Sequence, residues 1–271
     1  MNLDEIKARG LILIGCGKMG SAMLAGWLDS GIPASSIWIS DPQPSSWLAS
    51  TGVNINKSFP KSPAVCLIAV KPQIMFEAIS NLNDYVASDT LIVSIAAGIT
   101  LRQLEQAISS KSVIIRAMPN TPSAIGKGIT AIIGNSIAKN VHISISKILL
   151  EKISEVIELE HEDQMDIVTG LSGSGPAYVF YLIESLSNAG IEMGLSKDKA
   201  LHLAKATVAG SGLLAMTSKD SPSTLRENVT SPNGTTQAGL EILMNQKNGL
   251  LPLIKRTVEA ATKRSKELSN G

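Results

Sequence analysis

The sequence predicts a doubly wound α/β domain with a mostly parallel sheet, followed by an all-α domain. Through the first half, short apolar runs alternate with segments of helical apolar spacing. Runs that are apolar at every position are typical of strands buried on both faces, and alternation with helices makes such strands parallel. After about residue 140, long segments with apolar residues at i, i+3 and i+4 take over.

The elements of the first half follow one another closely. We expect strands over 11–14, 37–40, 64–70, 91–96, 113–117 and 129–133, and a helix over 21–30 after the first strand. The run at 64–70 ends before Pro72, because proline cannot donate to a sheet ladder. Thr100 is predicted to cap a helix in which Leu101, Leu104 and Ile108 share one face.

In the second half, helices are predicted over 177–190, 197–217, 235–245 and 250–268. They are separated by the clusters GLSGSGP, KDSPS and TSPNGTT, whose residue types favour breaks. We place the domain boundary within HEDQ, which gives domains of 1–160 and 161–271. The late helices are apolar over wide arcs, so they either form a core of their own or share one with a second chain. We expect a dimer.

Composition excludes several classes of function. Of the 271 residues, 44% are hydrophobic and 17% are charged, which is an ordinary globular composition. Lys and Arg number 24 against 23 Asp and Glu, so the charge balance predicts neither a nucleic-acid partner nor a membrane partner. His142, His161 and His202 lie far apart and show no ligand spacing, so we expect no metal.

Cysteine usage and the apolar runs indicate the compartment. Cys16 and Cys66 form no CxxC pair, which favours a reducing environment. The first ten residues mix acids and bases and do not resemble a signal peptide. No apolar run reaches the roughly 18–20 residues of a membrane span. We therefore expect a cytoplasmic protein.

Three glycines between the first strand and the first helix predict a Rossmann-type dinucleotide-binding domain in residues 1–160. Gly15 permits the tight turn, Gly17 lets the backbone approach a pyrophosphate, and Gly20 lets helix and strand pack closely. The start of the helix then offers unpaired N–H groups to the phosphates. The alternative is a tight turn without a ligand, which the strand–glycine–helix context disfavours.

About 20 residues further on, the second strand ends at Ser40-Asp41, where a Rossmann-type domain contacts the adenosine ribose. A carboxylate accepts the ribose hydroxyls of NAD and repels a 2′-phosphate, whereas a serine hydroxyl can bind that phosphate. Asp41 therefore favours NADH, and Ser40 leaves NADPH open. The alternative is that Asp41 is a turn residue before Pro42.

Three further clusters are candidates for binding the other reactant. RAMPNTP at 116–122 follows a strand, and GLSGSGP at 170–176 precedes a helix with Pro176 in its first turn. TSPNGTT at 230–236 also precedes a helix. Helix starts built from small residues can bind a carboxylate through backbone N–H groups, although both could equally be ordinary capped helix starts.

Together these motifs resemble the pyrroline-5-carboxylate reductases, which catalyse the last step of proline biosynthesis. The matching stretches are IGCGKMG (14–20), AVKP (69–72), VSIAAGIT (93–100), IRAMPNTP (115–122), VTGLSGSGPAYVF (168–180) and NVTSPNGTT (228–236). The resemblance implies an α/β Rossmann-type N-terminal domain and an all-α C-terminal domain for substrate binding and dimerisation. It also implies further assembly of dimers into a higher homo-oligomer, and hydride transfer from NADPH or NADH to C5 of 1-pyrroline-5-carboxylate to give L-proline.

The resemblance also implies a role for individual residues. For the cofactor these are Gly15, Cys16, Gly17, Lys18, Met19 and Gly20 at the pyrophosphate, Ser40 and Asp41 at the adenosine ribose, Val70 and Lys71 along the groove, and Ala97, Met118 and Asn120 near the nicotinamide ribose. For the substrate they are Ser174, Gly175, Pro176, Gly234, Thr235 and Thr236. The Thr236 hydroxyl is the candidate catalytic group, as the hydrogen-bonding partner of the ring nitrogen.

Two positions depart from the family pattern. Asn233 stands where a glycine is usual, and because asparagine tolerates the left-handed conformation we expect the turn to be kept. Asp41 stands where an uncharged residue is common, so the usual preference for NADPH is open.

Two other functions compete with this interpretation. A β-hydroxyacid dehydrogenase would need a lysine on the helix after LSGSGP, and AYVFYLIESLSNAG contains none. A protein that only senses dinucleotides would not need the intact Thr235-Thr236 pair.

Overall fold

The computed structural model describes residues 3–80, 82–109 and 111–270, so the limits 1 and 271 of the predicted domains lie outside it. The chain divides into two compact units. Unit 1 comprises Met1–Gly173 and Ala261–Gly271, and unit 2 comprises Ser174–Ala260. Unit 2 therefore begins later than residue 161, and the end of the chain returns to unit 1. The assignment of separate functions to 1–160 and 161–271 stays a prediction.

Unit 1 is built on one eight-stranded sheet with the order β3-β2-β1-β4-β5-β6-β7-β8. The strands are β1 Leu11–Ile14, β2 Ile37–Ser40, β3 Asn54–Ile55, β4 Val65–Ile68, β5 Leu91–Ser94, β6 Val113–Met118, β7 Gly128–Gly134 and β8 Ser154–Glu158. All neighbours from β3 to β6 pair in parallel, β7 runs antiparallel to β6, and β8 is parallel to β7. The predicted mostly parallel sheet is confirmed.

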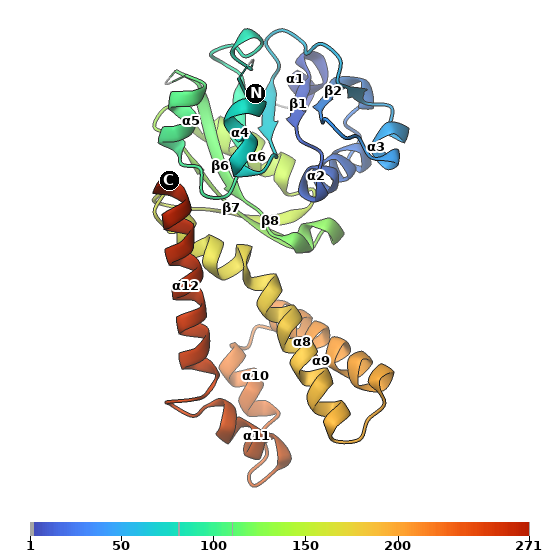
Figure 1. Ribbon diagram of the computed structural model, residues 1–271, viewed down its shortest axis with the longest axis vertical. Coiled ribbons are helices and arrows are strands. Elements are labelled where there is room, and N and C mark those ends of the chain that lie inside the picture. Colours follow the sequence, from blue (N-terminus) through green and yellow to red (C-terminus); the bar gives the residue numbers. More distant parts are fainter. Residues whose placement is uncertain (1–2, 81, 110, 271) are drawn as a thin grey trace. The chain divides into compact units, whose positions relative to one another are not determined.

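Helices cover both faces of this sheet (Figure 1). They are α1 Leu3–Arg9, α2 Lys18–Asp29, α3 Ser46–Ser50, α4 Pro72–Ala78, α5 Leu101–Ala107, α6 Asn140–Leu150 and α7 Gln164–Val168, with short 3-10 turns η1 Ala34–Ser36, η2 Leu82–Asp84 and η3 Thr121–Ile125. Side chains of α1, α2 and α6 pack with Leu11 and Leu13 on one face. Side chains of α4 and α5 pack with Ile12 and Ile14 on the other face of the sheet. Consecutive residues of β1 therefore pack against helices on opposite faces.

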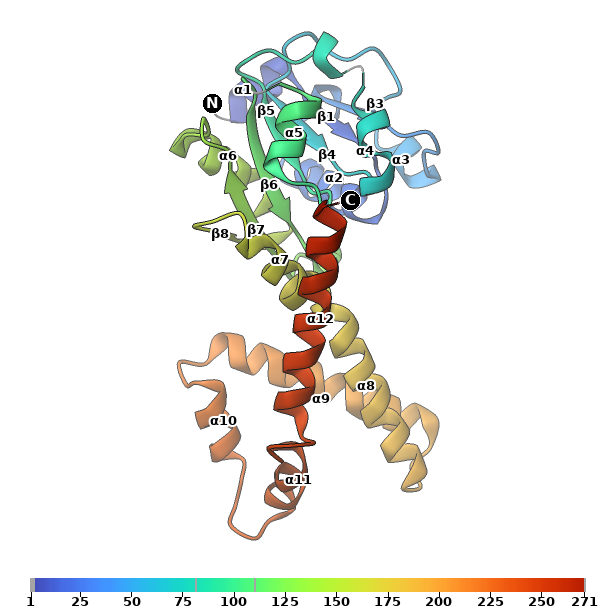
Figure 2. The same cartoon turned by 60° about the vertical axis from the view of Figure 1, so that its left-hand side comes forward.

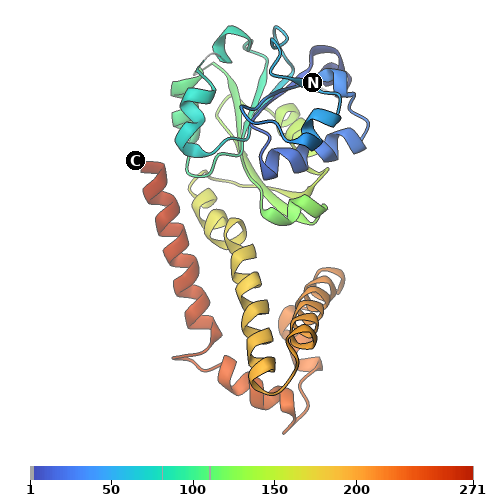
Figure 3. The ribbon, with the colours of Figure 1, turned by 45° about the vertical axis from the view of Figure 1, so that its right-hand side comes forward.

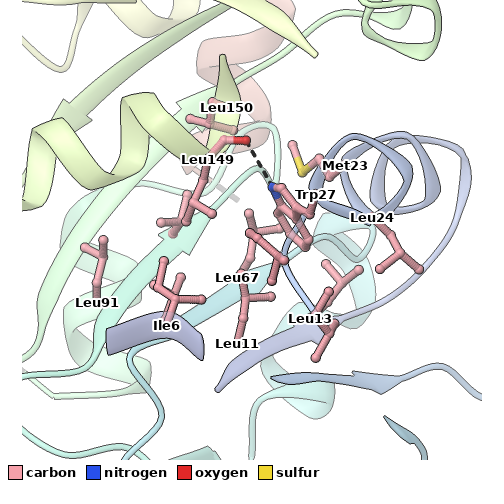
Figure 4. Packing of buried hydrophobic residues seen from close by; sticks show 14 of the residues in the cluster. Ile6, Leu11, Leu13, Met23, Leu24, Trp27, Leu67, Leu91, Leu149 and Leu150 are labelled. Carbon is pink, nitrogen blue, oxygen red and sulfur yellow. Dashed lines mark hydrogen bonds between the residues drawn. The ribbon is translucent and has the colours of Figure 1, made fainter. Parts of the chain in front are cut away.

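The larger of the two cores is centred on Trp27 of α2, which is fully buried. Its indole Nε1 donates to the Leu149 carbonyl oxygen of α6 at 3.0 Å. Figure 4 shows this bond and the aliphatic side chains around the ring. An indole needs a hydrogen-bonding partner when it is buried, and this contact joins two helices on the same face of the sheet.

The start of α5 and the end of the chain meet within unit 1. Thr100 caps α5 as predicted, in a capping box with Gln103. Gln103 also donates from Nε2 to the carbonyl oxygen of Ser269 at 3.3 Å. Ser265 donates to Asp166 Oδ1 of α7 at 2.6 Å. The last turns of α12 (Leu250–Asn270) are thus bonded to α5 and α7.

Unit 2 is all-helical, as predicted. It contains α8 Gly175–Glu192, α9 Lys197–Thr217, α10 Pro222–Asn228, α11 Thr235–Leu243 and the first part of α12. Helices α8 and α9 lie side by side, joined by a short turn (Figures 2 and 3). None of the helices in the described ranges is long and apolar enough to cross a membrane.

The structure corrects the predictions for residues 154–158 and for the KDSPS segment at 219–223. Residues 154–158 form the edge strand β8, although only helices were expected after residue 140. The strand is short and half exposed, with charged residues among its apolar ones, so its apolar signal is weak. The break predicted around KDSPS contains helix α10, which starts at Pro222 and is capped by the Ser221 hydroxyl. Proline is well tolerated in a first helical turn, so this cluster starts a helix as well as ending one.

Candidate active site

The residues predicted to bind a dinucleotide lie along one edge of the sheet in unit 1. Strands β1, β2, β4, β5 and β6 are parallel, so their carboxyl ends share that edge. Gly15–Gly20 follow β1, Asp41 follows β2, Val70 and Lys71 follow β4, Ala97 follows β5, and Asn120 follows β6, while Ser40 and Met118 end their strands. Chain order reverses between β1 and β4, and ligands of open α/β sheets bind at such a reversal.

The glycine-rich turn between β1 and α2 has the sterics that the sequence predicts. Gly15 has φ +88°, and its N–H donates to the Ser40 carbonyl oxygen at 2.8 Å. A Cβ on Gly20 would lie 2.5 Å from the Gly15 oxygen, so only glycine allows this approach. A Cβ on Gly17 would meet no atom within 4 Å. The turn is therefore closed on its sheet side and open at Gly17.

The open side of this turn fits an anionic group. Helix α2 begins at Lys18 after the N-cap residue Gly17, and no side chain in the described ranges caps its first N–H groups. Uncapped N–H groups and the helix dipole favour a phosphate at such a position. The Cys16 thiol is buried, which raises its pKa, so it stays protonated and adds no negative charge to the turn. A pyrophosphate is the group that this arrangement suits.

Asp41 is bonded directly to the glycine-rich turn. Its Oδ2 accepts a hydrogen bond from the backbone N–H of Cys16 at 2.7 Å. The two predicted cofactor segments after β1 and β2 are therefore joined by a charged hydrogen bond, which is stronger than one between neutral groups.

At the end of β6, Asn120 joins three segments of unit 1. Its Oδ1 accepts from the Ile129 N–H at 3.0 Å, and its Nδ2 donates to the Ser172 carbonyl oxygen at 3.2 Å. A Cβ on Gly173 would lie 2.6 Å from the Met118 methyl group. Asn120 therefore positions residues 170–173, the part of the GLSGSGP segment that belongs to unit 1, beside the sheet edge. Its predicted contact with a cofactor stays a prediction.

The GLSGSGP segment is helical, which corrects its interpretation as a break before a helix. Residues Thr169–Gly173 form a π-helical turn, η4, that continues α7. Ser174 has helical dihedral angles and leads into α8, with Pro176 in the first turn as predicted. The small residues permit the wide π turn rather than ending a helix. Such turns are frequent at functional sites.

In unit 2, the TSPNGTT segment makes a tight turn into α11. Asn233 takes the left-handed conformation with φ +59°, as predicted, and its N–H donates to Gln237 Oε1 at 2.7 Å. A side chain on Gly234 would collide with Ser231. Thr235 and Thr236 are exposed in the first turn, and within the ranges that the structure describes neither hydroxyl has a hydrogen-bonding partner. The N-cap residue is Gly234, and no described side chain caps the start of α11.

Comparison with known proteins identifies the family. Residues 162–268 match the family model for pyrroline-5-carboxylate reductase dimerisation, and residues 11–98 match one described as NADP oxidoreductase, coenzyme F420-dependent. The pyrroline-5-carboxylate reductase of Pseudomonas aeruginosa is 34% identical over 265 residues, which cover 96% of each chain. That of Pisum sativum is 36% identical over 262 residues, which cover 94% of each chain. The chain belongs to the pyrroline-5-carboxylate reductase family.

Solved structures of pyrroline-5-carboxylate reductases agree with this assignment. The enzyme of Coxiella burnetii superposes with a TM-score of 0.89 at 30% identity, covering 96% of this chain and 98% of the other. That of Plasmodium falciparum, with NADP bound, superposes with a TM-score of 0.84 at 30% identity, covering 97% and 99%. The chain is thus an NAD(P)H-dependent oxidoreductase with a dimerisation domain.

One ion pair of this reductase, which is buried on the arginine side, was missed by sequence reasoning. The Arg116 side chain on β6 is 4% exposed and lies 2.8 Å from Glu162 Oε1. The same oxygen accepts the Leu101 N–H at the start of α5, also at 2.8 Å. The sequence did contain a clue to this pair. Arg116 lies in a strand predicted to be buried on both faces, and a buried arginine needs an acidic partner. Nothing in the sequence indicated which acid it was.

The reductase shows no metal cluster in the described part of the chain, where no three His, Cys, Asp or Glu side chains gather.

Proposed function

We propose that the chain reduces 1-pyrroline-5-carboxylate to L-proline, with NAD(P)H bound along the strand ends of unit 1 and the substrate bound at the start of α11. The observation that most supports this is the uncapped, glycine-led start of α11 with two exposed threonine hydroxyls. A free helix start suits a carboxylate, and a hydroxyl next to it suits a ring nitrogen.

On the cofactor side, the proposed contacts are those predicted from the sequence, except at Cys16. The N–H groups of Gly17–Gly20 bind the pyrophosphate, whereas the Cys16 N–H donates to Asp41 Oδ2 and positions the turn. Ser40 and Asp41 bind the adenosine ribose, Val70 and Lys71 line the groove, and Ala97, Met118 and Asn120 lie near the nicotinamide ribose. When bound, NAD(P)H supplies the hydride that the imine carbon accepts.

On the substrate side, the backbone N–H groups of Thr235 and Thr236 bind the carboxylate, and Ser174, Gly175 and Pro176 shape the pocket. Gly234 forms the start of the helix, and its own N–H donates to the Ser231 carbonyl oxygen at 3.0 Å. The Thr236 hydroxyl hydrogen-bonds the ring nitrogen. During reduction the π pair of the C=N bond passes to nitrogen, and the imine carbon, C5 in proline numbering, gains the hydride. A nitrogen protonated beforehand keeps its proton, so the chain's contribution is mainly orientation.

Assembly beyond the dimer and the compartment are part of the same proposal. The exposed apolar helices of unit 2 support a dimer, and the resemblance to the family supports further assembly of dimers. The two cysteines are free and buried, which is compatible with a reducing, cytoplasmic location. Sedimentation of the purified protein tests the first statement and cell fractionation tests the second.

The test of the substrate site is a comparison of threonine variants. Oxidation of reduced cofactor by pyrroline-5-carboxylate is followed by absorbance for wild type, Thr236→Ala and Thr236→Ser. We expect turnover to fall by about tenfold or more in Thr236→Ala, the scale of one lost hydrogen bond to a charged group. Serine keeps the hydroxyl and should restore most of it. Cofactor affinity should not change in either variant.

Thr217→Ala is the matched control. Among the described residues, the Thr217 hydroxyl bonds to its own helix, through the Leu213 and Leu214 carbonyl oxygens. The substitution should leave turnover unchanged. In the same assay, 1-pyrroline lacks the carboxylate and should show a raised KM if the start of α11 binds that group. Equal KM values for the two imines, or full activity of Thr236→Ala, would contradict the proposed site.

A further inference from the structure

Four hydrogen bonds hold the side chain and the backbone of Asp41 in place. Its Oδ2 accepts the Cys16 N–H at 2.7 Å and its Oδ1 accepts the Gln43 N–H at 2.8 Å. Its backbone is bonded on both sides to one side chain: the Asp41 N–H donates to Asn56 Oδ1 at 3.0 Å, and Asn56 Nδ2 donates to the Asp41 carbonyl oxygen at 2.8 Å. Asn56 itself takes a left-handed conformation, with φ +50°.

These bonds leave the carboxylate able to bind more. Each carboxylate oxygen has two lone pairs, and the chain uses one on each. Both oxygens can therefore still accept a hydroxyl. Asp41 is half-buried, and it follows β2 at the position where a Rossmann-type domain contacts the adenosine ribose.

The negative charge of Asp41 has no cationic partner. In the described ranges, no lysine or arginine forms an ion pair with it. Residues 41–56 contain neither residue type, and the nearest lysine in sequence, Lys57, donates to Asn54 Oδ1 at 3.2 Å. A 2′-phosphate placed here would meet an uncompensated carboxylate and no arginine, whereas ribose hydroxyls would meet two acceptors.

We propose that Asp41 sets the choice of dinucleotide, so that this reductase prefers NADH to NADPH. The inference rests on the cofactor site proposed above. The fixed carboxylate accepts the ribose hydroxyls and repels a 2′-phosphate. Through the Cys16 N–H it also holds the glycine-rich turn, so selection at the ribose and positioning at the pyrophosphate depend on the same side chain.

The charge and the hydrogen bond to Cys16 can be separated by two substitutions. Asp41→Asn removes the charge but keeps an oxygen that can accept the Cys16 N–H. Asp41→Ser removes the charge and is too short to keep both bonds to the chain. Asp29→Asn removes an exposed carboxylate at the end of α2 and serves as the control.

The experiment measures the Kd of NADH and of NADPH by calorimetry, without substrate, for the full chain and each variant. The wild type should bind NADH about tenfold or more tightly than NADPH, and Asp41→Asn should reduce that ratio by about tenfold, because it removes a like charge beside the phosphate. Asp41→Ser should reduce the ratio similarly and also weaken NADH. Asp29→Asn should change neither constant.

Each outcome decides a different statement. An unchanged ratio in Asp41→Asn, or tighter binding of NADPH by the wild type, overturns the inference and leaves the proposed function intact. Failure of the folded wild type to bind either dinucleotide contradicts the proposed function itself. Thermal unfolding of every variant checks that the chain is folded.

Discussion

The two units differ in how far their apolar side chains are buried. Both buried apolar clusters lie in unit 1, where strands such as β1 and β4 are buried at every position. In unit 2, Phe180 is 62% exposed, Tyr181 69% and Leu251 73%. The buried side chains that its described helices α8 and α9 contain are small, namely Ser187, Ala200 and Ala204. Unit 1 forms its own core, and unit 2 does not.

The contrast explains why the second half of the chain is a dimerisation domain. A large exposed apolar patch is costly in water and marks a surface that another chain covers. A groove of about 550 Å³ between α8 and α9, lined by Phe180, Ile191 and Leu201 among others, lies in the same surface. Helices of this kind acquire a core only on association, so the stability of unit 2 should depend on protein concentration.

The largest effect should follow from placing a charge on that surface. Leu213 of α9 is 62% exposed in the single chain. Leu213→Asp should cost about 5 kcal/mol or more of association free energy, because a carboxylate would be buried without a partner. Sedimentation should then show monomers at concentrations where the wild type is associated. Lys219→Asp introduces the same side chain at an exposed polar position and should leave the mass unchanged. Unaltered assembly of Leu213→Asp would remove α9 from the interface.

Next in size is the core of unit 1. Trp27→Ala should lower the free energy of unfolding by about 3–5 kcal/mol, since it leaves a cavity and an unpaired Leu149 carbonyl group. Trp47 is 41% exposed, so Trp47→Ala should cost only about 0.5 kcal/mol. The loss can be followed through Cys66, which is fully buried and whose pKa is raised by that burial. A thiol reagent can therefore react with Cys66 only when unit 1 opens, so the reaction rate measures opening. The loss in Trp27→Ala should not vary with protein concentration. A dependence on concentration would contradict the self-contained core.

A smaller loss is expected at the ion pair between Arg116, which is buried, and Glu162, which is partly exposed. Glu162→Gln removes the charge that Arg116 faces and should cost about 1.5–3 kcal/mol, the range for a hydrogen bond between charged groups. Glu158 pairs with Lys147 at 3.1 Å on the surface, so Glu158→Gln should cost about 0–1 kcal/mol. Chemical denaturation of the two variants compares them directly. Equal losses would show that burial of Arg116 does not strengthen its pair.

The smallest effect should come from the turn before α11. Asn233 has φ +59°, so Asn233→Ala should cost about 1 kcal/mol of backbone strain. Asn233→Gly should be nearly neutral, because glycine adopts this conformation freely. If the turn presents the helix start to the substrate, KM for pyrroline-5-carboxylate should rise in the alanine variant only. The same KM in both variants would show that the turn does not position the site.

Much of unit 1 could be predicted from the sequence because its signals are local. Continuous apolar runs predicted the strands, and Thr100 predicted the start of α5. The glycine pattern predicted the turn after β1. The weak points were elements with mixed patterns, such as β8, and the π-helical turn at Thr169–Gly173, whose composition is that of a break. The family resemblance rested on several motifs together, and the comparisons confirm it over nearly the whole chain.

The sequence by itself determined the parallel sheet, the dinucleotide motif and the apolar helices that need a partner, because these follow from residues near one another in the chain. Only the tertiary structure showed which distant groups meet. Asp41 bonds to Cys16, Arg116 pairs with Glu162, and Ser265 at the end of α12 bonds to Asp166. A sequence pattern can indicate that a buried charge or a carboxylate needs a partner. Which residue becomes that partner depends on how the helices and strands pack.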